Sequence, residues 1–140
     1  MTVYADTSFL ASLYMQDVYS AAARERMKEK TRLWFTPLHS AECSHAIAKQ
    51  VFYKKISPAE ADSVFATLER DRADGLWLEA AIPENAFEVC ADLGRSYCPK
   101  LGMRTLDTLH VACALELKAE RFWTFDERQA KLAKVRGMKI

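Results

Sequence analysis

The chain lacks long apolar runs and paired cysteines. None of its 140 residues belongs to a run approaching 18 apolar residues, and the N-terminus has no basic-then-apolar leader. We therefore expect no membrane span, no secretory signal and a cytoplasmic location. The 4 cysteines include no C-x-x-C pair, so we interpret them as reduced core residues rather than as a disulfide or a zinc site.

A strong charge of either sign is also missing. The net charge is +1, so any affinity for nucleic acid would have to come from local patches. Internal repeats, linkers and low-complexity tracts are absent as well. With 50% apolar and 28% charged residues, the composition is ordinary for a globular protein. We expect one domain over residues 1–140, with a core that needs no disulfide.

Two short apolar runs, one near each end of the chain, stop at an aspartate. Residues 3–5 precede Asp6, and residues 122–125 precede Asp126. We interpret both runs as buried strands. In open parallel α/β sheets, ligands bind just beyond the carboxyl ends of the strands. If these two strands are near neighbours, their aspartates lie at one edge of the sheet.

The rest of the chain alternates between helical and strand-like patterns. This alternation predicts an α/β fold, a three-layer α/β/α sandwich around a short parallel sheet. Thr36-Pro37 and Ser57-Pro58 are typical helix starts. The predicted elements between the two terminal strands are helix 8–30 with an interruption near Gln16, strand 33–35, helix 36–55, helix 57–75, strand 76–80, a helix from Pro83 into a turn at 98–102, and a helix from Thr105. A helix over 127–135 follows the last strand, and residues 138–140 form a short edge strand or a frayed end.

Two more acids lie early in predicted helices. Glu42 falls in the second turn after Pro37, and Asp107 in the first turn after Thr105. With the aspartates at positions 6 and 126 they would place four carboxylates at one crevice. Two such charges about 4 Å apart repel by roughly 1 kcal/mol in water and about 4 kcal/mol at an effective dielectric near 20. Mg²⁺ or Mn²⁺ would relieve this repulsion and generate a nucleophile for phosphodiester hydrolysis.

Each acid also has a purely structural interpretation. Asp6 and Asp126 can cap the helices that follow them. Asp107 can interact with a helix dipole, and Glu42 can be an exposed helix residue. Taken singly, these are the commoner roles. The prediction of a metal site therefore depends on all of the acids meeting at one edge.

Together these segments resemble a PIN domain, and the resemblance covers essentially the whole chain. Length and tail pattern are most similar to the VapC-type toxin ribonucleases of toxin–antitoxin pairs. The segments that carry the resemblance are Asp6-Thr7-Ser8-Phe9-Leu10, the lone Glu42 on the second long helix, Leu106-Asp107-Thr108-Leu109-His110-Val111-Ala112 and Thr124-Phe125-Asp126.

The resemblance implies a Mg²⁺- or Mn²⁺-dependent endoribonuclease. It further implies a homodimer and a VapB-type antitoxin whose C-terminal segment covers the acidic site. The residues that match the family's catalytic and metal-binding acids are Asp6, Glu42, Asp107 and Asp126. Those that match hydroxyl positions orienting the carboxylates or a water are Thr7 or Ser8 and Thr124. The chain departs from the common pattern at Thr108, where a small Ala is usual.

Histidines, cations and aromatic residues near the acids leave several roles open. His39, His45 and His110 each lie three residues from an acid, so they are partners of the acids, proton donors or extra ligands, or else ordinary surface or core histidines. Candidates for contacts with RNA phosphates are Arg104, Lys100, Arg95 and Arg128. Arg104 is the first choice among them, and a role as a simple counter-ion fits its position equally well. Aromatic residues interpreted as core rather than as base-stacking platforms are Tyr14, Trp34, Trp77 and Trp123.

Three other functions compete with the nuclease as interpretations of the sequence. A phosphatase of the haloacid-dehalogenase type needs a second Asp two residues after the first, where this chain has Ser8. A free-standing PIN-type RNA-processing nuclease would share every motif. A non-catalytic nucleic-acid-binding or partner-binding domain of the same fold would normally have lost one or more of the acids, and here all are present.

Overall fold

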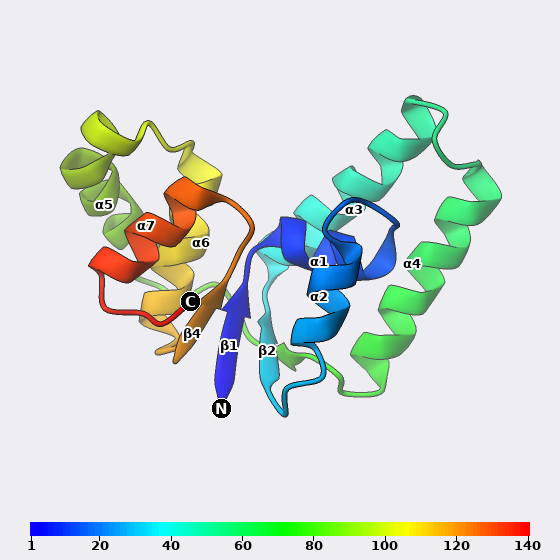
Figure 1. Ribbon diagram of the computed structural model, residues 1–140, viewed down its shortest axis with the longest axis horizontal. Coiled ribbons are helices and arrows are strands. Elements are labelled where there is room, and N and C mark those ends of the chain that lie inside the picture. The colour runs from blue at the N-terminus through cyan, green and yellow to red at the C-terminus, as the bar shows by residue number, and fades with distance from the viewer.

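Four parallel strands form the centre of the fold, in the order β3-β2-β1-β4 (Figure 1). The computed structural model describes residues 1–140. The first strand lies in the interior of the sheet and pairs with β2 on one side and β4 on the other. The two strands that end near the aspartates are therefore direct neighbours. The strands are Thr2–Ala5 (β1), Arg32–Phe35 (β2), Leu78–Glu79 (β3) and Arg121–Trp123 (β4).

Helices cover both faces of this sheet. Alternate residues of β1 point to opposite faces: Val3 and Ala5 belong to one apolar core with Phe9, and Tyr4 belongs to the other with Phe122. Figure 1 shows α5, α6 and α7 on one side of the sheet and α1 to α4 on the other. The predicted three-layer architecture is confirmed. The helices are Thr7–Tyr14 (α1), Ser20–Arg26 (α2), Pro37–Phe52 (α3), Pro58–Ala73 (α4), Ala86–Leu101 (α5), Thr105–Glu116 (α6) and Glu127–Val135 (α7).

Several predicted boundaries hold. The first helical pattern is divided into α1 and α2 at the interruption near Gln16. Pro37 and Pro58 occupy the first turns of α3 and α4, and the Ser57 hydroxyl accepts a hydrogen bond from the Glu60 amide at 3.0 Å. None of the helices is long and apolar enough to cross a membrane.

Other boundaries were wrong. The turn predicted at residues 98–102 is helical up to Leu101, because Pro99 removes only one main-chain hydrogen bond near the helix end. Gly102 ends the helix in the left-handed conformation, with φ of 63°. The last strand is Arg121–Trp123, so Thr124 and Phe125 lie beyond it. Residues 138–140 add only an isolated bridge, between Arg121 and Lys139. Three cysteines are buried as predicted, whereas Cys98 is partly exposed.

Candidate active site

The interior strand β1 delivers Asp6 to the carboxyl edge of the sheet. This side chain caps α1, because its Oδ1 accepts a hydrogen bond from the Phe9 amide at 3.0 Å. Asp6 is only 4% exposed. Burial raises its pKa to about 6, against the opposing effect of the Phe9 amide, and the nearby Asp107 carboxylate adds to the rise. The site therefore contains a buried carboxyl whose charged form is poorly stabilised by its surroundings.

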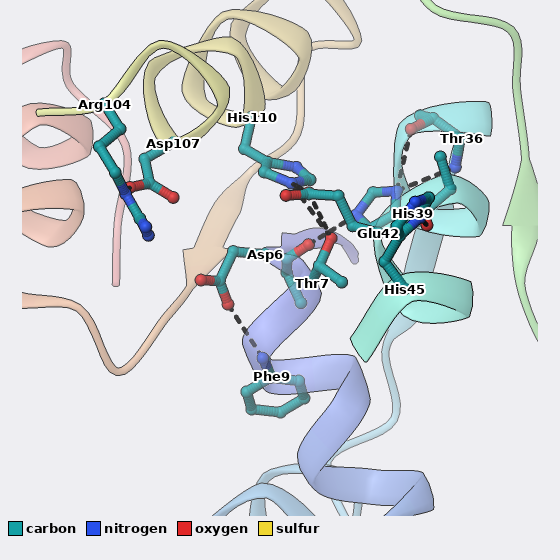
Figure 2. Close-up of polar contacts among 12 residues, drawn as sticks. Asp6, Thr7, Phe9, Thr36, His39, Glu42, His45, Arg104, Asp107 and His110 are labelled. Carbon is teal, nitrogen blue, oxygen red and sulfur yellow. Dashed lines mark hydrogen bonds and ion pairs between the residues drawn. The ribbon is translucent and has the colours of Figure 1, made fainter. Parts of the chain in front are cut away.

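Asp107 approaches this carboxyl from the first turn of α6. Its Oδ2 accepts a hydrogen bond from Arg104 Nε at 3.1 Å, and the arginine side chain is 82% exposed. The same hydrogen bond raises the pKa of Arg104. Figure 2 shows the Asp107 carboxylate on the same side of the site as Asp6, with the guanidinium of Arg104 next to it. An exposed cation therefore lies beside one of the candidate acids.

Asp126 caps α7 and is fixed by a small polar network. Its Oδ1 accepts hydrogen bonds from the Arg128 and Gln129 amides at 2.9 and 3.0 Å. Its own amide donates to Thr124 Oγ1 at 3.0 Å, and this hydroxyl donates to Gln129 Oε1 at 2.7 Å. The Gln129 side-chain Nε2 donates in turn to the Asp107 carbonyl at 3.0 Å. The loop after β4 is therefore tied to the start of α6.

Sequence reasoning missed Gln129 altogether. The residue is fully buried, together with Leu132 and Ala133 on the same face of α7. A polar residue at an apolar helical position was a readable signal, because buried polar side chains need hydrogen-bond partners.

Glu42, on α3, turns toward a histidine and a hydroxyl. Its Oε1 accepts hydrogen bonds from His110 Nε2 and, at 2.8 Å, from Thr7 Oγ1. Burial raises the pKa of Glu42, but the hydrogen bonds from His110 and Thr7 outweigh it, so the pKa lies below its ordinary value. Figure 2 shows this carboxylate directed at His110 and Thr7 rather than at Asp6. Of the two hydroxyl candidates, Thr7 makes the contact, whereas Ser8 is exposed and accepts from Ser12 through its main-chain carbonyl.

His110 is buried and bonded at both ring nitrogens. Nδ1 lies 2.7 Å from the Tyr4 hydroxyl, and Nε2 faces the Glu42 carboxylate. An ionised carboxylate only accepts hydrogen bonds, so we assign a proton to Nε2 and the donor role at Nδ1 to the Tyr4 hydroxyl. His110 therefore positions Glu42, and Tyr4 on β1 positions His110.

His39 joins the end of β1 to the start of α3. Its Nδ1 accepts from the Thr36 amide at 3.0 Å, and its Nε2 donates to the Ala5 carbonyl at 2.8 Å. Burial lowers its pKa to about 3, and the neighbouring His110 acts in the same direction. This ring is thus a neutral core residue. His45 is exposed and bonds the Ala41 carbonyl at 2.8 Å.

The acids share one edge of the sheet but do not form a tight cluster. No group of three His, Cys, Asp or Glu side chains has the geometry to hold a metal ion. The physical reason is that mutually repelling carboxylates take other partners: helix N-termini, an arginine and a histidine. The donor set still fits a hard divalent cation, because Mg²⁺ commonly uses one or two carboxylates plus water and phosphate oxygens.

The candidate phosphate-binding cations lie at different distances from the acids in the fold. Arg104 pairs with Asp107, and Arg128 Nη1 donates to the Gly102 carbonyl at 3.4 Å. Arg95 instead pairs with Asp92 on the exposed surface of α5. Lys100 lies in the last turn of that helix.

Fold and site together define a parallel α/β protein with acidic side chains along the edge of the sheet where the strands end. The family model for the PIN domain matches residues 3–135, and the chain belongs to this family. The resemblance seen in the sequence is thereby confirmed.

Solved structures show the same fold at low sequence identity. Mycobacterium tuberculosis VapC20, described as a sarcin–ricin loop cleaving toxin, has a TM-score of 0.71 and 14% identity over 97% of this chain and 95% of its own. FitAcB from Neisseria gonorrhoeae has a TM-score of 0.69 and 16% identity over 94% and 93%. VapBC2 from Rickettsia felis, bound to a DNA fragment from its promoter, has a TM-score of 0.66 and 12% identity over 99% and 96%. No curated protein matches the chain.

Proposed function

We propose that this protein is a Mg²⁺- or Mn²⁺-dependent endoribonuclease and the toxin of a VapBC-type toxin–antitoxin pair. The observation that carries the proposal is the buried Asp6, with Asp107 beside it, at the end of an interior strand of a PIN domain. Burying one carboxylate near another is unfavourable unless a cation compensates the charge. The likeness in fold to a toxin described as cleaving the sarcin–ricin loop supports RNA as the substrate.

The side chains at the candidate site have different proposed roles. Asp6 and Asp107 are the first candidates to hold the metal ion, and Asp126 and Glu42 complete the acidic set. A bound divalent ion supplies a nucleophile at neutral pH and stabilises charge on the leaving oxygen. The exposed Arg104 is available to bind and orient a phosphate of the RNA backbone.

The polar residues around the acids keep them in place. Thr7 and His110 hold Glu42 ionised, because their hydrogen bonds lower its pKa. Thr124 and Gln129 fix the loop that carries Asp126. These contacts would hold Glu42 and Asp126 in fixed orientations at this edge of the sheet.

The proposal includes partners. A VapB-type antitoxin would cover the acidic site, and two copies of the chain would form a homodimer in the cytoplasm. The likeness to VapBC2, which is described as bound to promoter DNA, supports a toxin–antitoxin pair. A reading frame for a small DNA-binding protein next to the one for this chain would add support.

The decisive experiment is RNA cleavage by the purified protein with Mg²⁺, with Mn²⁺ and with EDTA. We expect cleavage with either metal ion and none with EDTA. Asp6→Ala and Asp107→Ala should abolish cleavage, because each removes a candidate ligand. Asp62→Ala, which removes an exposed carboxylate from α4, is the matched control and should cleave normally.

A non-catalytic RNA-binding or partner-binding domain is the second candidate function. The observation that favours it is the lack of a preformed cluster of three ligands, with Glu42 bonded to His110 instead. RNA binding without cleavage under either metal ion would select this function. Cleavage that responds to Asp6→Ala would exclude it.

A further inference from the structure

A stack of aromatic rings leads from the protein core to the surface beside the candidate active site. The Tyr19 ring lies on Phe125 with centroids 4.6 Å apart and an interplanar angle of 8°. Phe125 lies on Phe9 at 5.5 Å and 17°, and Phe9 packs against Trp123 at 5.4 Å. Phe9 and Trp123 are buried and Phe125 is partly buried, whereas Tyr19 is 46% exposed. The stack therefore ends in an aromatic ring available to solvent.

The inner rings are anchored to the acidic site through the main chain. The Phe9 amide is the group that donates to Asp6 Oδ1. Phe125 lies between Thr124 and Asp126, in the loop after β4. Tyr19 therefore stacks on Phe125, and the next residue in the chain is the candidate catalytic acid Asp126.

The loop that carries Tyr19 is held by its own hydrogen bonds. Asp17 Oδ1 accepts from the Tyr19 amide at 2.8 Å, and Asp17 Oδ2 accepts from the Ser12 hydroxyl at 2.8 Å. The Asp17 amide donates to the Ser20 hydroxyl at 2.9 Å, which donates to the Met15 carbonyl at 2.9 Å. Because the loop is already fixed, a ligand that stacks on the ring does not have to order it.

We propose that Tyr19 is a stacking platform for an unpaired base of the RNA substrate, next to the phosphate that is cut. The inference rests on the proposed nuclease function and names a binding residue for it. Single-stranded RNA is commonly held by bases stacked on exposed aromatic side chains. Arg104, which pairs with Asp107 in the same acidic site, offers the complementary contact to a phosphate. Stacking tolerates any base, so the platform sets the position of the strand rather than its sequence.

The first test measures RNA affinity without cleavage. Fluorescence anisotropy with a labelled single-stranded 12-nucleotide RNA is carried out in EDTA. Tyr19→Ala should weaken binding by roughly 10- to 100-fold, whereas Tyr19→Phe, which keeps the ring, should stay within about twofold. Tyr19→Leu fills similar space without an aromatic face and should behave like Tyr19→Ala. Phe87→Ala is the matched control, since Phe87 is an exposed aromatic residue on α5.

Abasic substrates make the test specific for stacking. In a set of RNAs with one abasic position each, one position should weaken binding to the original protein by about the same factor as Tyr19→Ala. The same abasic RNA should cause no further loss in the Tyr19→Ala variant. Additive losses, unchanged affinity of Tyr19→Ala, or no measurable RNA binding by the original protein would each overturn the platform. An effect of Tyr19→Ala on antitoxin binding alone would assign the ring to a protein interface and also overturn it.

The two proposals fail in different ways. If RNA is never cut but binding still depends on Tyr19 and on one base, base stacking on Tyr19 stands and the nuclease function does not. If RNA is cut and Tyr19→Ala leaves KM, kcat and the cleavage position unchanged, the nuclease stands and the platform does not. Where both hold, Tyr19→Ala should raise KM or move the cleavage position while kcat changes little.

Discussion

Replacing Asp6 by asparagine should stabilise the protein at neutral pH in the absence of metal ions. Asp6 is 4% exposed, and burial raises its pKa from the ordinary value of 3.8 to about 6. Between these pH values the unfolded carboxyl is ionised while the folded one keeps its proton. The unfolded state then binds fewer protons, so the free energy of unfolding falls as the pH rises.

The size of this effect follows from the two pKa values. At about 1.4 kcal/mol per pH unit, the loss between 3.8 and about 6 amounts to about 3 kcal/mol and is complete above the folded pKa. Asparagine cannot ionise and escapes this loss. It is also a good N-cap residue, so the hydrogen bond from the Phe9 amide can be kept.

Urea unfolding followed by tryptophan fluorescence, at pH 4 and pH 7 with EDTA, tests this reasoning. The free energy of unfolding of Asp6→Asn, relative to that of the original protein, should increase by up to about 3 kcal/mol from pH 4 to pH 7. Asp62→Asn, which removes an exposed carboxylate, controls for the change in net charge. Mg²⁺ should stabilise the original protein more than Asp6→Asn. A stability difference that is the same at both pH values would refute the reasoning.

Two further predictions concern stability alone. Tyr14→Phe should lower the free energy of unfolding by about 1–3 kcal/mol. The reason is that the Tyr14 hydroxyl donates to Asp71 at 2.6 Å and accepts from Trp77 Nε1 at 3.0 Å. An unchanged urea midpoint would show that these two hydrogen bonds contribute nothing to stability. Ser57→Ala should cost about 1 kcal/mol through loss of the cap on α4, measured as a lower melting temperature. Ser57→Asp should restore most of it, and equal melting temperatures for Ser57→Ala and the original would contradict the capping argument.

Local patterns in the sequence were enough to predict most of the helices and strands. Apolar runs bounded by polar residues identified β1 and β2, and the proline and capping residues at Thr36 and Ser57 identified two helix starts. These signals act over a few residues, so they can be read without knowledge of the fold. The boundaries of β4 and α5 were misjudged, because aromatic residues favour a strand at Phe125 and a proline favours a turn at 99.

The sequence also supplied the candidate acids of the site, but not their positions relative to one another. Asp6, Glu42 and Asp107 are separated by dozens of positions, and only strand order and helix packing decide which of them lie close together. The counter-ion role of Arg104 was readable from its spacing of three residues from Asp107, whereas no local pattern predicted that both His110 and Thr7 would hold Glu42.

By itself, then, the sequence determined the α/β class, the family and the set of acids, because these depend on residue type and spacing along the chain. The tertiary structure decided the hydrogen-bond partner of each acid, the burial that raises the pKa of Asp6 to about 6, and the stacking of Tyr19 on Phe125. Such properties depend on distances and exclusion of water across the fold. Those quantities arise only when segments distant in sequence pack against one another.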